Sequence, residues 1–198
     1  MIDTFQKAER DQIGDGQNNR DSQVQSNGSG SKIQFDVSST ELHSSVAQEE
    51  FPAPIAKLLG LKLLHAEKGT AVVEFVANER YANPAGTLHG GVLCDIADAA
   101  MGFAYYTTLE AEESMTTLEL KINFLRPVWK ATLRAKAKVV RAGRLVGLIE
   151  CDVVDEQERL VARASSTCLT LRGQLAEGRR IPPFALRGFG HTPGSIGA

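Results

Sequence analysis

The stretch NPAGTLHGGVLCDIADAAMGFA, residues 83–104, contains the features that decide the fold. Its first residues are rich in Asn, Pro and Gly, and they predict a loop. Residues 89–109 then carry apolar side chains on almost every side of a helix, which is typical of a buried helix. The helix nevertheless begins with Gly90 and Gly91 and has Asp98 in its middle. Glycine lowers helix stability and a buried carboxylate costs desolvation, so a function at this position would explain both.

The glycine pair suits an anion or a developing oxyanion. The first turn of a helix has N–H groups without internal partners, and this end carries a partial positive charge. Without side chains, Gly90 and Gly91 leave those N–H groups accessible to a ligand. The alternative is that the glycines only allow close packing or a loop turn, and local physics alone does not separate the two.

The position of Asp98 predicts a reactive carboxylate. Small and aliphatic residues surround it along the helix, so we expect it to be desolvated and more basic than an ordinary aspartate. This environment is typical of a general base or a nucleophile. The alternative is a solvated Asp on a narrow polar strip, and we expect Asp95 to have that place.

Gly90 and Asp98 are too far apart along one helix to act on the same carbonyl. They are eight residues apart, which corresponds to about 12 Å at 1.5 Å per residue. If both act on one small group, a second copy of the helix must lie antiparallel to the first. That arrangement predicts a two-fold dimer whose active sites are shared between chains.

The pattern on either side of this helix predicts an α+β domain at residues 51–172. A short helix at 51–60 and a hairpin at 61–77 precede the loop, and four strands follow the helix, at 117–125, 133–141, 144–155 and 160–171. We expect these four strands to form an antiparallel meander. In 117–125, Leu118, Leu120, Ile122 and Phe124 are expected to share one face. The economical packing wraps the antiparallel sheet around the one long central helix.

The two ends of the chain differ from this domain. Residues 1–50 are acidic and poor in apolar side chains, so we expect a disordered arm. Residues 173–198 are rich in Gly and Pro and predict a tail without regular structure.

Composition and charge exclude several classes of function. The net charge is −2, which does not favour nucleic acid as a partner. No apolar run is long enough to cross a bilayer and the N-terminus is unlike a signal peptide, so we predict a cytoplasmic protein without a membrane partner. Cys94, Cys151 and Cys168 are expected to be buried reduced thiols. No His, Cys, Asp or Glu cluster has metal-ligand spacing, so no metal is expected.

The spacing of Asn83, Gly86, His89, Gly90, Gly91 and Asp98 resembles that of one enzyme family. It is similar to the hot-dog-fold acyl-CoA thioesterases of the phenylacetate-pathway (PaaI-like) type. The order of elements also agrees, and the resemblance covers about residues 52–171. It implies hydrolysis of an acyl-CoA thioester by a homodimer, or by a dimer of dimers. It implies no cofactor, because coenzyme A is part of the substrate.

The resemblance also implies roles for single residues. The Gly90 N–H would polarise the thioester carbonyl, and Asp98 of the partner subunit would be the base or the nucleophile. Asn83 and His89 would position water and hold the loop; we favour this role for His89 over general-base catalysis. Thr117 would orient the water, and its neighbour Thr116 is the alternative residue for this role.

Substrate binding is predicted at Gly91 and at basic residues that could meet the phosphates of coenzyme A. Arg126, Arg141 and Arg144 lie near predicted strand ends, where solvated charges are equally expected. Two other functions compete with hydrolysis. A non-catalytic acyl-CoA-binding module would have no reason to keep Asp98, and a hot-dog dehydratase would need a His–carboxylate motif that we do not find.

Overall fold

The computed structural model describes residues 53–179. The predicted arm at 1–50 and most of the predicted tail lie outside this range. The elements are, in chain order, α2 (Pro54–Leu59), β1 (Lys62–Glu67), β2 (Thr70–Ala77), η2 (Glu79–Tyr81), α3 (Gly90–Tyr106), β3 (Ser114–Phe124), β4 (Ala131–Ala142), β5 (Val146–Val154), β6 (Leu160–Leu171) and η3 (Gly173–Leu175).

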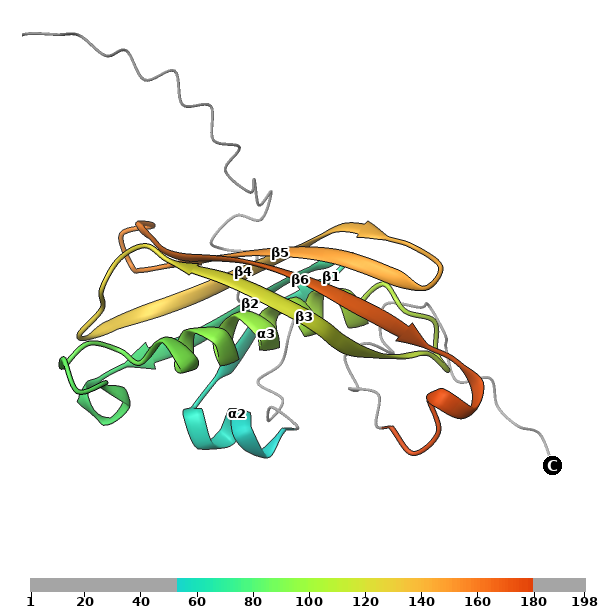
Figure 1. Cartoon of the computed structure of the whole chain (residues 1–198), viewed down its shortest axis with the longest axis horizontal. Helices are drawn as coiled ribbons and strands as arrows, with labels where there is room; N and C mark the ends of the chain where they lie inside the picture. Colours follow the sequence, from blue (N-terminus) through green and yellow to red (C-terminus); the bar gives the residue numbers. More distant parts are fainter. Residues whose placement is uncertain (1–52, 180–198) are drawn as a thin grey trace, which may run out of the picture. The chain divides into compact units, whose positions relative to one another are not determined.

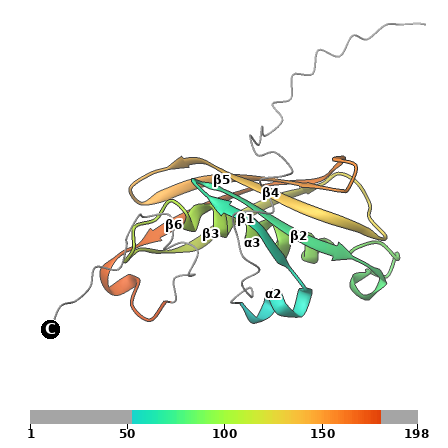
Figure 2. The ribbon, with the colours of Figure 1, turned by 180° about the vertical axis from the view of Figure 1, so that it is seen from behind.

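The six strands form one antiparallel sheet in the order β1-β2-β4-β5-β6-β3. Figure 1 shows α3 lying along one face of this sheet, with α2 on the side of α3 away from the strands. The view from behind shows the same layers (Figure 2). The predicted α+β fold, with an antiparallel sheet around one long helix, is therefore confirmed.

The predicted meander of four consecutive strands is wrong in one respect. β4, β5 and β6 follow one another, but β3 pairs with β6 at the far edge and β2 pairs with β4. The connection between β3 and β4 therefore crosses from one edge of the sheet to its middle. Alternation within a strand identifies its two faces but contains no information about which neighbour it will pair with.

Small and branched side chains form the face of the sheet that packs on α3. In the pairing of β2 with β4, Ala71 lies opposite Ala137, Val73 opposite Ala135, and Phe75 opposite Leu133. All six are fully buried. Alanines at these positions allow the helix to approach the strands closely, and this packing holds α3 in place.

A bulge in β3 changes which side chains face the helix. Thr117 lies opposite Cys168 and Glu119 lies opposite Thr167, so Leu118 is an extra residue between two regular pairs. The predicted common face of Leu118 with Leu120 is therefore wrong, and Leu118 is exposed. A bulge moves every residue before it to the other face, and bulges of this kind often re-aim a side chain next to an active site.

Helix α3 is buried along most of its circumference but not all of it. Leu93, Ile96, Ala97, Ala100, Met101, Ala104 and Tyr105 are among its buried residues. A stripe at helical spacing is exposed or half-buried in the single chain, and it consists of Gly91, Asp95, Asp98, Gly102 and Tyr106. The helix is therefore buried as expected except along this stripe, which includes Asp95, the residue expected on a narrow polar strip.

Three smaller predictions can also be compared with the structure. Residues 173–175 form a 3₁₀ helix, and Arg179 donates a hydrogen bond to the Met115 carbonyl at 3.0 Å, so the start of the tail is ordered rather than irregular. Cys151 and Cys168 are buried free thiols as predicted, whereas the free thiol of Cys94 is only half-buried. Between residues 53 and 179 there is no helix with the length and hydrophobicity needed to cross a membrane.

Candidate active site

His89 caps the N-terminus of α3. Its Nδ1 atom accepts a hydrogen bond from the Gly91 N–H at 2.9 Å. This contact satisfies one of the N–H groups of the first helical turn that lack an internal partner. The geometry supports the structural role that we favour for His89. It also means that the Gly91 N–H is already engaged within the helix turn.

Both glycines of the pair have a local packing reason. A Cβ atom at Gly91 would lie 3.0 Å from His89 Nδ1, so a side chain there would press on the cap. A Cβ atom at Gly90 would lie 3.0 Å from Cζ of Phe124, whose ring covers this position. Within residues 53–179, the Gly90 N–H donates no hydrogen bond. Gly90 therefore combines close packing with an available donor at the helix end.

Asn83 organises the loop before the helix. Its Oδ1 atom accepts hydrogen bonds from the N–H groups of Ala85 and Thr87, at 2.9 and 3.2 Å, and its amide nitrogen donates to the Thr87 hydroxyl at 2.9 Å. Gly86 has a φ of 79° within this turn, a conformation that favours glycine. The contacts of Asn83 favour the predicted loop-holding role over water positioning, because most of its hydrogen-bonding groups are used by the loop.

Asp98 faces Thr117. The Thr117 hydroxyl donates a hydrogen bond to Asp98 Oδ1 at 3.0 Å, which leaves Oδ2 of the same carboxylate without a contact from Thr117. In the single chain Asp98 is exposed, so the expectation of a desolvated carboxylate is not met there. The reason is the uncovered stripe of α3, on which Asp98 lies.

Asp95 lies one turn before Asp98 and is exposed on the same stripe of α3, as expected for a residue on a narrow polar strip. Partial burial, and then the negative charge of Asp98, raise the pKa of Asp95. Burial and the two carboxylates likewise raise the pKa of the Cys94 thiol, which argues against a thiolate nucleophile at neutral pH. The i, i+3 spacing of the two aspartates was the signal in the sequence for this coupling.

A cavity of about 270 Å³ opens beside Asp98 and Thr117. It lies between α2, α3 and the start of β3, and we call it the α2–α3 cavity. Its lining residues are Ala53, Ile55, Ala56, Leu59, Leu61, Asp95, Asp98, Ala99, Gly102, Phe103, Tyr106, Met115 and Thr117. The wall is therefore apolar apart from the two aspartates, Thr117 and the Tyr106 hydroxyl. The sequence indicated the apolar helix but gave no sign that α2 would close this cavity.

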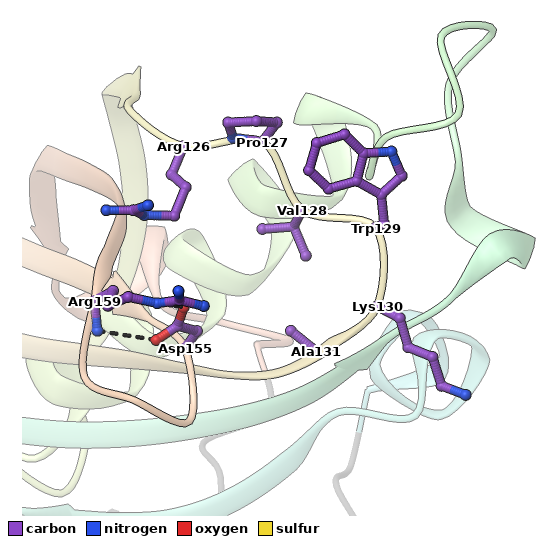
Figure 3. Close-up of a pocket in the computed structure, with 8 residues that line it drawn as sticks. All are labelled: Arg126, Pro127, Val128, Trp129, Lys130, Ala131, Asp155 and Arg159. Atoms are coloured by element: carbon purple, nitrogen blue, oxygen red, sulfur yellow. Dashed lines mark hydrogen bonds and ion pairs between the residues drawn. The ribbon is translucent and has the colours of Figure 1, made fainter.

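A second cleft, of about 290 Å³, lies between the β3–β4 connection and the β5–β6 turn. We call it the loop cleft; it is lined by Arg126, Pro127, Val128, Trp129, Lys130, Ala131, Asp155 and Arg159. Figure 3 shows the Arg126 and Arg159 side chains close together on one side of the connection, with the Trp129 ring further along it and Lys130 pointing away. Trp129 is 61% exposed, although an aromatic ring of this size is normally covered.

The loop cleft lies close to the N-terminus of α3. The Leu88 N–H donates to the Val128 carbonyl at 2.6 Å, which joins the β3–β4 connection to the residue before His89. Arg159 is paired with the buried Asp155 through a contact of 2.7 Å, whereas Arg126 forms no ion pair with any residue in the range 53–179. The sequence prediction named Arg126 from this cleft but did not name Trp129 or Arg159, which also line it.

Arg144 is far from this cleft within one chain. It lies in the β4–β5 turn, and the 12-residue strand β4 separates that turn from the β3–β4 connection. At about 3.3 Å per residue this is a separation of roughly 40 Å, so one phosphate cannot contact both Arg126 and Arg144 of the same chain. The Arg144 carbonyl accepts a hydrogen bond from Arg172. Arg141 also lies towards the Arg144 end of β4.

The fold and this arrangement of groups define a class of protein. A helix end with a free N–H group, a carboxylate paired with a hydroxyl and an adjoining apolar cavity are the parts required for hydrolysis of an acyl ester or thioester. Comparison with known proteins identifies the class further. The sequence pattern of the thioesterase superfamily matches residues 85–162, which include the glycine pair, Asp98 and Thr117.

Relatives and solved structures agree with this match. A candidate esterase of Saccharolobus solfataricus is 37% identical over 118 residues, which cover 60% of this chain and 84% of that protein. The acyl-coenzyme A thioesterase PaaI of Escherichia coli is 34% identical over 109 residues, which cover 54% and 75% of the two chains. The structure of the E. coli PaaI protein from the phenylacetic acid degradation operon superposes with a TM-score of 0.58, at 28% identity, covering 62% of this chain and 87% of that one.

The chain belongs to the thioesterase superfamily, in the hot-dog-fold group that includes the PaaI proteins. It is accordingly an enzyme of the thioester hydrolase class. The resemblance drawn from Asn83, Gly86, His89, Gly90, Gly91 and Asp98 is thereby confirmed at the level of the family.

Proposed function

We propose that this protein hydrolyses an acyl-CoA thioester to the free acid and coenzyme A. The observation that carries the proposal is the Thr117–Asp98 contact of 3.0 Å at the wall of the apolar α2–α3 cavity. It places a carboxylate next to a space that suits an acyl group. The name of the E. coli relative, an acyl-coenzyme A thioesterase, supports the choice of coenzyme A as the thiol.

In this mechanism Asp98 is the general base. Its free Oδ2 atom takes a proton from water, and the resulting hydroxide attacks the thioester carbonyl carbon. The hydrogen bond from Thr117 to Oδ1 fixes the plane of the carboxylate and thereby aims Oδ2. Collapse of the tetrahedral intermediate breaks the carbon–sulfur bond, and the coenzyme A sulfur takes up a proton as it leaves. A direct attack by Asp98 is the other route, and labelled water would place ¹⁸O in Asp98 only on that route.

The Gly90 N–H of a second chain would stabilise the oxyanion. Gly90 and Asp98 of one chain are about 12 Å apart along α3, so a second α3 must supply the donor. Two features support a homodimer. The stripe of Gly91, Asp95 and Asp98 is open in the single chain, and β3 is an edge strand with one exposed aromatic residue, Phe124, on its helix-facing side. Exposed strand edges of this kind are ready to pair.

The two halves of the substrate would then lie on different chains. The acyl group occupies the α2–α3 cavity of the chain that provides Asp98. The coenzyme A nucleotide lies on the loop cleft of the chain that provides Gly90, because that cleft adjoins the same helix end. Arg126 would bind a phosphate and the exposed Trp129 ring would stack on the adenine.

A non-catalytic acyl-CoA-binding module is the alternative. Thiol release from a panel of acyl-CoA substrates, followed with a thiol-reactive dye, separates the two functions. We expect release by the wild-type protein, and Asp98→Asn should lower turnover by about 10²–10⁴-fold with little change in melting temperature, since Asp98 is exposed. Binding of acyl-CoA without release would support the module instead. The cytoplasmic location, the dimer of dimers, substrate contacts by Gly91 and Arg144, and the absence of a cofactor or metal stay predictions.

A further inference from the structure

Gly102 is an unusual residue for its position in α3. It lies in the interior of a 17-residue helix, where only proline is less favourable than glycine. Close packing does not explain it. A Cβ atom at Gly102 would meet only Met115 Cε, at 3.9 Å, which is an ordinary van der Waals distance. The helix therefore has space for at least an alanine at position 102, so packing does not require a glycine there.

The missing side chain keeps the α2–α3 cavity open. Asp98, Gly102 and Tyr106 are spaced by four residues, so they lie one above the other on the same face of α3, and all three line the cavity. Any side chain at position 102 would project between the other two. The cavity thus runs from the carboxylate at Asp98, past the gap at Gly102, towards Tyr106 and Met115.

We propose that Gly102 determines how large an acyl group the enzyme accepts, with the acyl group lying over Gly102 and its far end against Tyr106 and Met115. This inference rests on the proposed function, because it places the thioester carbonyl at Asp98. The size of the cavity fits a sizeable acyl group. An engineered cavity of about 150 Å³ already holds benzene, and this one is about 270 Å³. The substrate class is therefore acyl-CoA thioesters whose acyl group is at least as bulky as a benzene ring.

The test compares Gly102→Ala and Gly102→Leu with the wild-type enzyme on acetyl-CoA, octanoyl-CoA and phenylacetyl-CoA. We expect Gly102→Leu to lower kcat/KM for the two bulky substrates by at least about 10-fold, since one methylene in an apolar pocket changes discrimination by about 10–200-fold. Hydrolysis of acetyl-CoA should change by less than about 2-fold. Ala142→Leu, at the exposed end of β4, adds a similar side chain outside the cavity and should leave all three substrates unaffected.

Gly102→Ala provides a second readout that a structural glycine would not give. An alanine there should raise the melting temperature by roughly 2–4 °C, because it favours the helix and the space exists. The same variant should already disfavour the bulky substrates relative to acetyl-CoA. An equal loss on all three substrates, or a lower melting temperature with Gly102→Ala, would show that Gly102 serves the fold. An unchanged preference in Gly102→Leu would show that the acyl group lies elsewhere.

Binding of non-hydrolysable thioethers separates this proposal from the proposed function. Calorimetry with S-octyl-CoA and S-ethyl-CoA measures occupation of the cavity without turnover. Gly102→Leu should weaken S-octyl-CoA by at least about 10-fold and S-ethyl-CoA by less than about 2-fold. Wild-type binding of S-octyl-CoA with no hydrolysis of any thioester would reject the hydrolase and leave the role of Gly102 standing. Equal binding of S-octyl-CoA by both proteins would reject the role of Gly102 alone.

Discussion

The Thr117 hydroxyl donates a hydrogen bond to Asp98 at 3.0 Å because a bulge at Leu118 turns Thr117 towards the helix. Leu120, Ile122 and Phe124 alternate as a regular strand would. Without the extra residue, the same alternation would place Leu118 and Thr116 on the helix side. The bulge therefore decides which of the two threonines contacts the carboxylate.

The two threonines give a matched pair of variants. Thr117→Val removes the hydroxyl that orients Asp98, and a hydrogen bond to a charged group contributes about 1.5–3 kcal/mol, so kcat should fall by roughly 10–150-fold. Thr116→Val makes the same chemical change on the neighbouring residue of β3 and should change kcat by less than about 2-fold. Steady-state kinetics with one acyl-CoA substrate measures both. Equal effects of the two variants would contradict the role of the bulge.

A mixed dimer tests whether active sites are shared. Asp98→Asn removes the base and Gly90→Pro removes the donor N–H, and proline is tolerated at the first helical position. Each homodimer should be nearly inactive. Random pairing makes half of the dimers mixed, and each mixed dimer has one intact site, so about a quarter of wild-type activity should return.

Gly90→Ala is the control for this experiment. It retains the N–H but presses on the Phe124 ring in the same way as proline, since both have a Cβ atom. If Gly90→Ala is as inactive as Gly90→Pro, the loss comes from the ring contact rather than the donor. Restored activity in the mixture would then say nothing about the oxyanion. If purified mixed dimers of folded chains show no restored activity, the shared-site arrangement is rejected.

The loop cleft should affect substrate affinity rather than chemistry. Trp129→Ala and Arg126→Ala should each raise KM for acyl-CoA by roughly 10-fold, because stacking on an aromatic ring contributes about 1–3 kcal/mol per base and a charge-assisted contact contributes a similar amount. Turnover at saturation should be nearly unchanged. Lys138→Ala removes an exposed cation on β4 outside the cleft and serves as the control. A fall in kcat without a change in KM would show that Trp129 and Arg126 contribute to the chemical step and not to substrate affinity.

Asp95 should make stability depend on pH. Burial and the charge of Asp98 raise the pKa of Asp95, so the folded chain holds this proton more tightly than the unfolded chain. Ionisation of Asp95 therefore destabilises the fold as pH rises from the ordinary aspartate pKa, about 4, through the raised value. Asp95→Asn should melt at a higher temperature than wild type at pH 7.5, and the difference should shrink as the pH approaches about 4.

The control for this measurement is Glu177→Gln, which removes one exposed carboxylate far along the chain from the site. It corrects for the change in net charge. Thermal melts of the three proteins across this pH range measure the difference. A Tm difference between Asp95→Asn and wild type that is constant with pH would mean that Asp95 ionises equally easily in the folded and unfolded chains.

The sequence by itself determined the class of fold and the position of the site. Apolar periodicity identified α3 and the strands, because burial of one face requires that pattern whatever the neighbours are. The residues from Asn83 to Asp98 resemble the pattern of one enzyme family, and the comparisons confirmed that resemblance at the level of the family. Helix geometry indicated that Gly90 and Asp98 cannot meet within one chain.

Tertiary structure decided the remainder. Strand order placed β3 at the edge beside β6, and nothing in its alternation specified that partner. The bulge at Leu118 selected Thr117 over Thr116, because a backbone irregularity changes the face of a residue without changing the sequence pattern. Packing of α2 beside α3 formed the open α2–α3 cavity at Gly102, and the β5–β6 turn brought Arg159 to Arg126 and Trp129 of the β3–β4 connection. These contacts join residues far apart in the chain, so only the folded arrangement brings them together.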